Sequence, residues 1–461
     1  MSIVKAFVVP HPPLAVHEVG RGEEEQIRKT IDSYNKVAKE IANIKPETII
    51  ITSPHTVLYN DYFHISPGKT ATGSFANFGA RYVSFNETYD EELVKEIENC
   101  CKEINFPAGT KGEVNKELDH GTMVPLYFIE KEYKDFKLIR IGLSNYSYID
   151  HYKLGQIIKK AVDKLNRKVV FVASGDLSHR LQEYGPYGFI KEGPIYDNKI
   201  METLSKGAFN ELLEYDEELV EKAEVCGHNS FIIMSGALDG INVQTETLSH
   251  QDITGVGYGV CIYTPKDNNK ERLFLDKYLI KEKNRLIKQR EKADDYVQLA
   301  VKTIYEYIKH NRIIDTPYNI NKELLDKKAG VFVSIHKFNR LRGCIGTISA
   351  TCDNIADEII CNAINASARD YRFDPITEDE LDYLDINVDV LMEPEDIKSK
   401  DELDIKKYGV IVSSGIKRGL LLPDIDGINS VDEQVEIAKR KGNIKDNEEI
   451  KLQRFEVIRH K

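Results

Sequence analysis

Three histidines each follow an apolar, β-branched run of the kind that forms buried strands: His11, His55 and His179. Because ligands of parallel α/β sheets bind at the carboxyl ends of the strands, we expect these imidazoles in one pocket. Neutral imidazoles bind divalent metals, and an imidazole that titrates near neutrality also transfers protons. Asp176, shortly before His179, is expected to orient the His179 ring by accepting its N–H. The simpler interpretation of each histidine alone is a packed or capping residue at a strand end.

Two further polar segments precede predicted helices and could reach the same edge of the sheet. His120 lies in one of them, and Glu224 and Cys226 lie in the other. Two imidazoles with a carboxylate match a non-haem Fe(II) facial triad, whereas two imidazoles with a thiolate suit zinc or iron. We expect Fe(II), with Zn(II) or another divalent metal as the alternative, and both Glu224 and Cys226 stay open as the third ligand. The simpler interpretation is a surface residue for Glu224 and an ordinary buried thiol for Cys226.

A second set of residues that could do chemistry lies near the C-terminus. Arg342 and Cys344 belong to a short glycine-containing turn motif. A cationic neighbour lowers the pKa of a thiol, so Cys344 could be reactive, or it could simply pack inside. Arg342, Asp370 and Arg372 could form an anion-binding cleft or a structural ion-pair network.

The elements that must position these residues alternate between strands and helices. Such alternation implies crossover connections and an α/β fold, a mainly parallel sheet with helices on both faces. The segment 255–264 is interpreted as a closing strand. The predicted strands cover residues 3–9, 47–53, 136–143 and 168–174, and the predicted helices cover residues 24–44, 91–104 and 152–165.

After residue 264 the sequence becomes highly charged and basic. We expect a metal-site domain over 1–264, a charged linker helix over 265–290 and a smaller α+β domain over 291–461. The linker helix is expected to continue without a break through residues 294–310. Within the last domain we predict strands at 330–337 and 384–392 and a helix at 354–370.

Composition excludes several classes of function. The formal net charge of −12 argues against a broad nucleic-acid footprint and against binding to anionic membranes. No apolar run is long enough to span a bilayer, and the first residues lack the features of a secretory signal. The cysteines show no CxxC spacing, and free thiols suit a reducing compartment. We therefore expect a cytoplasmic protein, and the oligomeric state stays open.

The ordered segments AFVVPHPPL, IIITSPH, ELDHGTMVPLYF, ASGDLSH and GVGYGVCIY resemble the class III extradiol-dioxygenase family, whose LigB-type fold includes the Memo proteins. The resemblance covers about residues 1–264. It implies a ferrous ion on His11 and His55, His179 as the acid/base histidine and His120 as a second pocket histidine. No residue clearly matches the dioxygenase glutamate. The pair Cys226-Gly227 instead resembles the Memo pattern, in which a cysteine lies in the metal pocket.

The second half carries its own resemblance. The segments LRGCIGT, RDYRF and RGLLLP resemble the AMMECR family over about residues 291–461. A chain with both halves is similar to the AmmeMemoRadiSam group, which implies a radical-SAM partner protein.

Three functions follow as hypotheses. The first is an extradiol ring-cleaving enzyme that uses Fe(II) and a small catechol-like or aminophenol-like aromatic substrate. The second is a Memo-like metalloprotein that is not a dioxygenase and works with a radical-SAM partner. The third is a scaffold or binding protein with a vestigial site.

Overall fold

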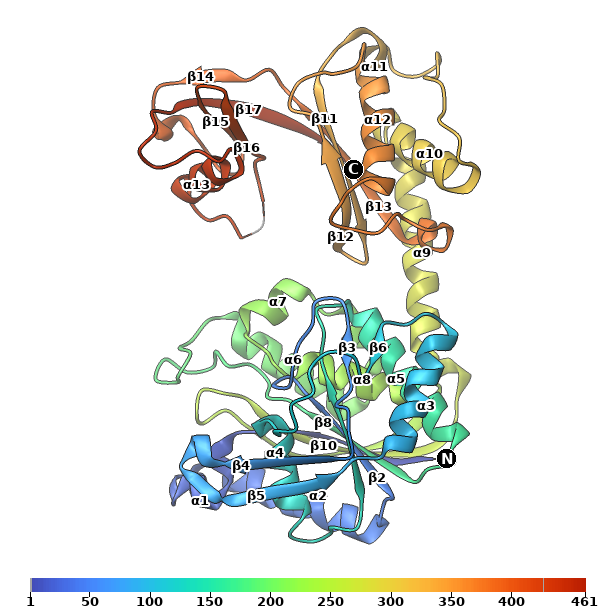
Figure 1. The fold of residues 1–461 in the computed structure, drawn as a ribbon, viewed down its shortest axis with the longest axis vertical. Helices are drawn as coiled ribbons and strands as arrows, with labels where there is room; N and C mark the ends of the chain where they lie inside the picture. Colours follow the sequence, from blue (N-terminus) through green and yellow to red (C-terminus); the bar gives the residue numbers. More distant parts are fainter. Residues whose placement is uncertain (1, 426) are drawn as a thin grey trace. The chain divides into compact units, whose positions relative to one another are not determined.

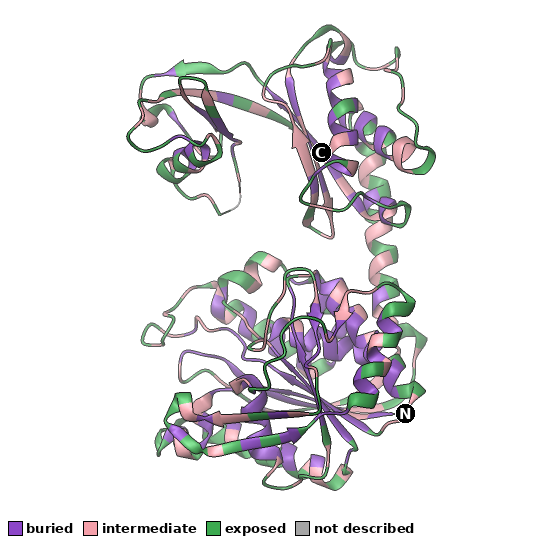
Figure 2. Ribbon diagram, in the orientation of Figure 1, coloured by how far each residue is buried: buried purple, intermediate pink, exposed green. Residues whose placement is uncertain are grey.

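The computed structural model describes residues 2–425 and 427–461. The chain divides into two compact units, Met1–Leu279 and Ile280–Lys461 (Figure 1). Each unit buries a hydrophobic core of its own, as the buried segments in Figure 2 show. No helix among the described residues is both long and apolar enough to cross a membrane.

Six strands form the central sheet of the first unit: β1 (Ile3–Val9), β2 (Thr48–Ser53), β7 (Lys137–Gly142), β8 (Val169–Ser174), β9 (Ile241–Gln251) and β10 (Tyr258–Asn268). Their order across the sheet is β7-β2-β8-β1-β10-β9. The first four of these are parallel, while β10 and β9 add to the edge in antiparallel orientation. The predicted mainly parallel α/β fold is confirmed, and the predicted closing strand pairs antiparallel with β1.

Helices cover both faces of this sheet, which is why β2 and β8 are buried along their whole length. On one face α2 (Arg28–Ile44) packs with α4 (His120–Ile129), and on the other α5 (Tyr148–Lys164) packs with α8 (His228–Ala237) (Figure 1). The chain reaches β2 through α2 and β8 through α5, and the strand ends at one edge are left to the loops.

The backbones of α5 and α8 touch because two glycines lie at their contact. A Cβ atom on Gly155 would lie 2.0 Å from the Ile233 carbonyl oxygen, and one on Gly236 would lie 2.0 Å from the Tyr152 carbonyl oxygen. No side chain fits in this space. At the other end of α8, the loop with Cys226 lies against the residues that follow β8, since a Cβ atom on Gly175 would lie 2.2 Å from the Gly227 Cα.

Smaller elements complete the first unit. A hairpin of β4 (Thr70–Phe75) and β5 (Ala80–Thr88) contacts α4, and β3 (Phe63–His64) pairs with β6 (Ala108–Gly109). The remaining helices are α1 (His17–Gly20), α3 (Glu91–Glu103), α6 (Glu192–Lys206) and α7 (Glu217–Lys222).

The second unit is built on an antiparallel sheet, as expected for the smaller α+β domain. The strand order is β12-β11-β13-β17-β15-β16, and β14 pairs with β17. Its strands are β11 (Gly330–Lys337), β12 (Arg340–Gly346), β13 (Leu384–Leu391), β14 (Glu395–Ile397), β15 (Tyr408–Ser414), β16 (Lys417–Leu421) and β17 (Lys451–His460). Its helices include α10 (Asp295–His310), α11 (Lys322–Asp326), α12 (Ile355–Ala368) and α13 (Val431–Lys441).

The prediction of one unbroken helix through residues 294–310 is wrong. Helix α9 (Phe274–Lys292) ends, and α10 begins as a separate helix after Asp294. The Asp294 carboxylate accepts the backbone N–H groups of Tyr296 and Val297 at 3.1 and 3.2 Å. A side chain that caps free N–H groups in this way starts a new helix. The charged character of the whole segment hid this local signal.

Two carboxyl groups meet where α4 ends. Glu130 is the C-terminal cap of α4, and its carboxyl lies against that of Glu87 in β5. Burial, followed by the Glu87 charge, raises the pKa of Glu130 to about 8, although Lys134 lies 3.9 Å away. The folded protein therefore holds a proton here that the unfolded chain releases near its ordinary pKa.

We expect Glu130→Gln to stabilise the protein at pH 8 but not at pH 5. A folded-state pKa raised above the unfolded value makes stability fall as pH rises from the unfolded pKa to the folded one. Glutamine mimics the protonated carboxyl, so the gain at pH 8 should be about 1–3 kcal/mol. Denaturant unfolding at both pH values measures it, with the exposed Glu132→Gln as control. An equal effect of Glu130→Gln at pH 5 and pH 8 would contradict the assignment.

Candidate metal centre

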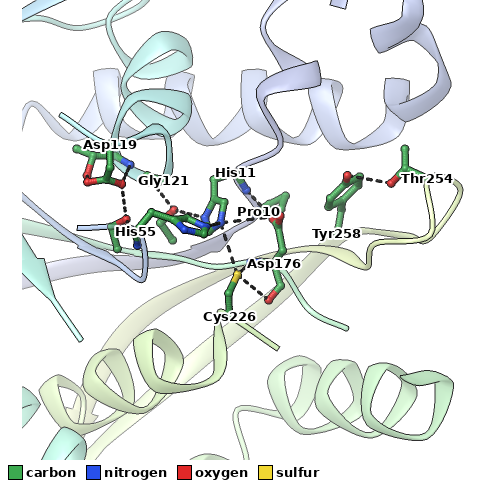
Figure 3. A network of polar contacts seen from close by, with 12 residues as sticks. Pro10, His11, His55, Asp119, Gly121, Asp176, Cys226, Thr254 and Tyr258 are labelled. Carbon is green, nitrogen blue, oxygen red and sulfur yellow. Dashed lines mark hydrogen bonds and ion pairs between the residues drawn. The ribbon is translucent and has the colours of Figure 1, made fainter. Parts of the chain in front are cut away.

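The carboxyl ends of three neighbouring strands meet at one edge of the first unit's sheet. The chain leaves β1 toward His11 and β2 toward His55, and β8 lies between these two strands. The Nε2 atoms of His11 and His55 lie 2.9 Å apart, and the Cys226 Sγ lies 3.5 Å from the His11 Nε2 (Figure 3). In the described part of the chain these three residues offer donor atoms within 4.8 Å of one another.

Hydrogen bonds determine which nitrogen of His11 carries its proton. The Ser174 hydroxyl has one proton and donates it to the Gly121 carbonyl oxygen at 2.5 Å. Toward His11 Nδ1, which lies 2.9 Å away, the same hydroxyl oxygen must therefore accept. His11 thus carries its proton on Nδ1, and its Nε2 lone pair faces His55 and Cys226. A fixed tautomer of this kind is usual for a histidine that binds a metal.

His120 extends the cluster of imidazoles. It is the first residue of α4, and its ring stacks on that of His55 with centroids 4.1 Å apart. Asp119 caps α4 by accepting the Thr122 N–H at 3.0 Å, and it also accepts the Ser53 hydroxyl at 2.5 Å. One carboxylate therefore ties the end of β2 to the start of α4 and sets the distance between the two rings.

His179 approaches the centre from the loop after β8. Together with Asp176 and Cys226 it forms a second group of donor atoms within 4.8 Å of one another. Its Nε2 is buried and has no hydrogen-bond partner among the described residues. The Tyr187 ring stacks on the imidazole with centroids 5.0 Å apart. A buried, unpartnered imidazole nitrogen beside a cluster of metal donors is suited to accept a proton from a bound molecule.

Asp176 has a partner other than the expected one. It accepts the His11 backbone N–H at 2.7 Å, and its own N–H donates to the Cys226 Sγ at 3.2 Å. No hydrogen bond joins it to His179 in the described contacts. Asp176 therefore holds His11 and Cys226 in place, and the face of the His179 ring is held by Tyr187.

Glu224 does not join the centre, which corrects its prediction as a third ligand. Its carboxylate accepts from Arg180 at 2.8 Å, and its side chain is 43% exposed. The backbone at Glu224 has a φ of 49°, in the turn that follows α7. This turn directs Glu224 outward to Arg180, whereas Cys226 faces the imidazoles. Of the two candidates, the thiol is the one that the fold brings to His11.

Burial keeps the donors uncharged. It lowers the pKa of all four imidazoles of the cluster, to about 4 for His120 and His179 and well below the usual value for His11, where neighbouring imidazoles add to the effect. Burial also raises the pKa of the Cys226 thiol well above its usual value and that of Asp176 to about 7. A bound cation reverses this preference, because metal coordination deprotonates a thiol outright. Uncharged nitrogens with one thiol fit the donor set of a divalent transition metal.

The spacing of the two imidazoles fits a shared ion as well. Two nitrogens that each lie about 2.1 Å from one ion can be at most about 4.2 Å apart. The 2.9 Å between the Nε2 atoms of His11 and His55 satisfies this limit.

A cavity of about 390 Å³ opens beside the imidazole cluster. His55 and His120 contribute to its wall, and the Phe78 ring meets His120 edge-on with centroids 5.6 Å apart. The cavity is large enough for a small ring compound. His55 is the candidate metal donor that lines it, and His11, Cys226 and His179 are not among its lining residues.

In the second unit, the predicted site residues Asp370 and Arg372 bind to the backbone of a neighbouring strand and to each other. Asp370 accepts the Cys344 backbone N–H at 2.9 Å, and Arg372 donates to the Cys344 carbonyl oxygen at 2.8 Å. Asp370 and Arg372 also pair with each other at 2.6 Å. Because β12 is an edge strand, these contacts satisfy backbone groups that no neighbouring strand reaches.

Arg342 is likewise engaged. It pairs with Glu380 at 2.9 Å and donates to the Asp374 carbonyl oxygen at 2.8 Å. The Cys344 thiol is half-buried and lies 3.3 Å from the Ser334 hydroxyl. Of the two interpretations offered for these residues, the contacts agree with a structural ion-pair network.

Sequence reasoning did not identify Ser174, Tyr187 or Arg140. Ser174 ends the apolar run of β8, so a polar residue at a strand end was an available signal. Tyr187 belongs to a loop without regular structure, and no local pattern links it to His179. Arg140 lies inside a strand, where only the tertiary structure shows that it lines the cavity.

Comparison with known proteins matches residues 5–261 to the family described as the catalytic LigB subunit of aromatic ring-opening dioxygenase, and residues 297–460 to AMMECR1. A Clostridium acetobutylicum protein is 42% identical over 475 residues, covering 100% of both chains. A Thermotoga maritima protein is 45% identical over 168 residues, which cover 36% of this chain and 97% of the relative. The crystal structure of an uncharacterized protein from Pyrococcus horikoshii is 30% identical, with a TM-score of 0.34, and covers 37% of this chain and 90% of that one.

We expect Ser174→Ala to weaken Zn(II) binding by about 10–100-fold, the usual effect of losing a hydrogen bond that orients a ligand. Without the hydroxyl, nothing at this position accepts the Nδ1 proton of His11 and holds its tautomer. Competition with a chromophoric chelator measures the affinity. Ser235→Ala removes another buried hydroxyl, bonded within α8, and should leave the affinity unchanged. Equal affinities of wild type and Ser174→Ala would refute this role for Ser174.

Proposed function

The chain belongs to the family of the catalytic LigB subunit of aromatic ring-opening dioxygenases and carries a C-terminal AMMECR1 domain, and from this we propose that it is a metal-dependent oxidoreductase that opens a small aromatic ring. The observation that carries the proposal is the convergence of His11, His55 and Cys226 around one point beside a cavity. A catechol-like or aminophenol-like compound is the proposed substrate class.

His11, His55 and Cys226 would hold the ion. The His11 tautomer leaves Nε2 free for it, and the Asp176 backbone N–H donates to the Cys226 sulfur, which stabilises the thiolate. Fe(II) is the proposed metal, with Zn(II) or another divalent ion as the alternative. When bound, a redox-active ion supplies the electron transfer to O₂ that ring opening requires.

His179 is the proposed general base. At neutral pH its imidazole is uncharged, because burial lowers its pKa to about 4. Its buried Nε2 can take a proton from a phenolic hydroxyl of the substrate and return it to the product. Tyr187 holds the ring in place from one face. His120, at the cavity wall, is positioned to contact the bound ring.

Anaerobic reconstitution tests the proposal. The full-length protein should bind about one Fe(II), and addition of a catechol and O₂ should give the yellow product that extradiol ring opening forms. The His11→Ala/His55→Ala double variant should bind no metal, since two neutral nitrogen donors are lost. His179→Gln should bind metal as wild type does and lose turnover by about 10²–10⁴-fold, the usual contribution of a general base.

Two results would end the proposal. One is a wild-type protein that binds no metal, and the other is a double variant that binds it equally well. The first result would favour a binding protein with a vestigial site. Such a protein should still bind its partners when both histidines are replaced.

The Cys226 thiol favours a second candidate function. A thiolate in place of a carboxylate changes both the metal preference and the oxygen chemistry of the site. This observation supports a Memo-like metalloprotein that does not open rings and acts with a radical-SAM partner.

Replacing Cys226 by serine tests the thiol on which both candidates depend, whereas ring opening by the wild-type protein separates them. We expect Cys226→Ser to reduce Zn(II) and Fe(II) affinity by at least about tenfold, since a hydroxyl is a poorer ligand than a thiolate for these ions. Metal analysis of the purified variant beside wild type measures the loss. Unchanged metal content would remove the thiol from the centre, and with it the ligand set of the first candidate and the main support for the second.

A further inference from the structure

We propose that the cavity beside His55 and His120 selects aromatic compounds that carry an amino group and discriminates against those that carry a carboxylate. The inference rests on the proposed function, which supplies the aromatic ring of the substrate. The new part is the charge that the ring's substituent carries. It comes from the side chains that surround the cavity.

Two carboxylates that form no ion pair among the described residues line the cavity, and both belong to exposed residues. Glu113 and Glu117 belong to the loop that precedes α4, and both are lining residues. The Glu113 backbone N–H donates to the Tyr59 hydroxyl at 2.9 Å, and Glu117 forms a bridge with Thr72 next to the β4–β5 hairpin. These contacts keep the loop, and with it the two carboxylates, beside the cavity.

The cation among the described lining residues is Arg140, and it is not available to a ligand. Its side chain is 4% exposed. Its Nε donates to the Ser66 hydroxyl at 2.7 Å, and its two terminal nitrogens donate to the carbonyl oxygens of Glu117 and Asn115 at 2.7 and 3.3 Å. The Asp119 carboxylate lies 3.7 Å away and offsets its charge. Arg140 therefore shapes the wall and holds the loop without offering a free donor pair.

The lining is consequently anionic. Arg140 and Asp119 cancel, and Glu113 and Glu117 remain. The two lysines of the same loop, Lys111 and Lys116, are not among the residues that line the cavity. A carboxylate on the ring would enter a space with two like charges and no free cation. An ammonium group would meet two carboxylates, and because both belong to exposed residues the attraction depends on the salt concentration.

Neutral side chains complete the lining. Ser74 and Asn77 line the cavity together with Phe78, a residue that is 36% exposed. A ring bound at His55 and His120 would share the cavity with Glu113 and Glu117. The charge of its substituent therefore affects its binding.

Binding of three matched catechols to the Zn(II)-loaded full-length protein tests the inference without turnover. The ligands are 4-(2-aminoethyl)catechol, 4-ethylcatechol and 3-(3,4-dihydroxyphenyl)propanoate, measured anaerobically by isothermal titration calorimetry. We expect the amine to bind about tenfold more tightly than the carboxylate at low salt, with the uncharged compound between them. The ratio should shrink in 0.5 M salt, since salt screens charges near the cavity mouth.

Charge-removing variants provide the matched control. In Glu113→Gln/Glu117→Gln the ratio should fall to about twofold or less, while the affinity for 4-ethylcatechol stays the same. Glu132→Gln removes an exposed carboxylate that does not line the cavity and should leave the ratio as in wild type. A carboxylate ligand that binds as well as the amine, or a ratio that the double variant does not alter, would overturn the inference. If the metal-loaded protein binds none of the three, the proposed function itself is wrong and the selectivity falls with it.

Discussion

The candidate metal centre depends on one constraint, the fixed orientation of the His11 imidazole at the carboxyl end of β1. Its backbone N–H is held by Asp176 and its Nδ1–H by Ser174, which leaves Nε2 to face His55 and Cys226. Ser174 and Asp176 reach His11 because β8 pairs in parallel with β1, with Val9 opposite Ser174. A strand pairing in the middle of the sheet therefore determines which nitrogen of one imidazole is free.

Burial then decides what this centre can bind. The pocket brings together several imidazoles, a thiol and a carboxyl, and desolvation favours the uncharged form of each. Because its imidazoles are uncharged, such a cluster does not repel a cation. Its nitrogen and sulfur donors favour transition metals over hard ions. The second unit shows the opposite use of charge. There Asp370 and Arg372 pair with each other and with the backbone of an edge strand, so their charges complete a sheet rather than a site.

Much of the fold was predictable because its signals are local. The buried parallel strands are continuous apolar runs, and helices with one apolar face separate them, so the mainly parallel α/β sheet followed from periodicity. The α+β class of the smaller domain followed from its resemblance to the AMMECR family. The break between α9 and α10 was missed, although its cause is also local. Asp294 caps α10, but it stands in a run so rich in charged residues that one more carboxylate did not stand out.

The sequence by itself determined the types and the order of the donors, since three histidines at the ends of apolar runs in a parallel α/β chain must come to one sheet edge. The tertiary structure decided between Cys226 and Glu224, because a turn with positive φ directs Glu224 outward to Arg180. It also decided that the Asp176 carboxylate accepts a hydrogen bond from the His11 backbone and not from His179. It placed Arg140 and the loop carboxylates around a cavity. These outcomes depend on side-chain directions in irregular loops. A loop has no repeating geometry from which the direction of a side chain can be read, so only its packing against the rest of the chain settles it.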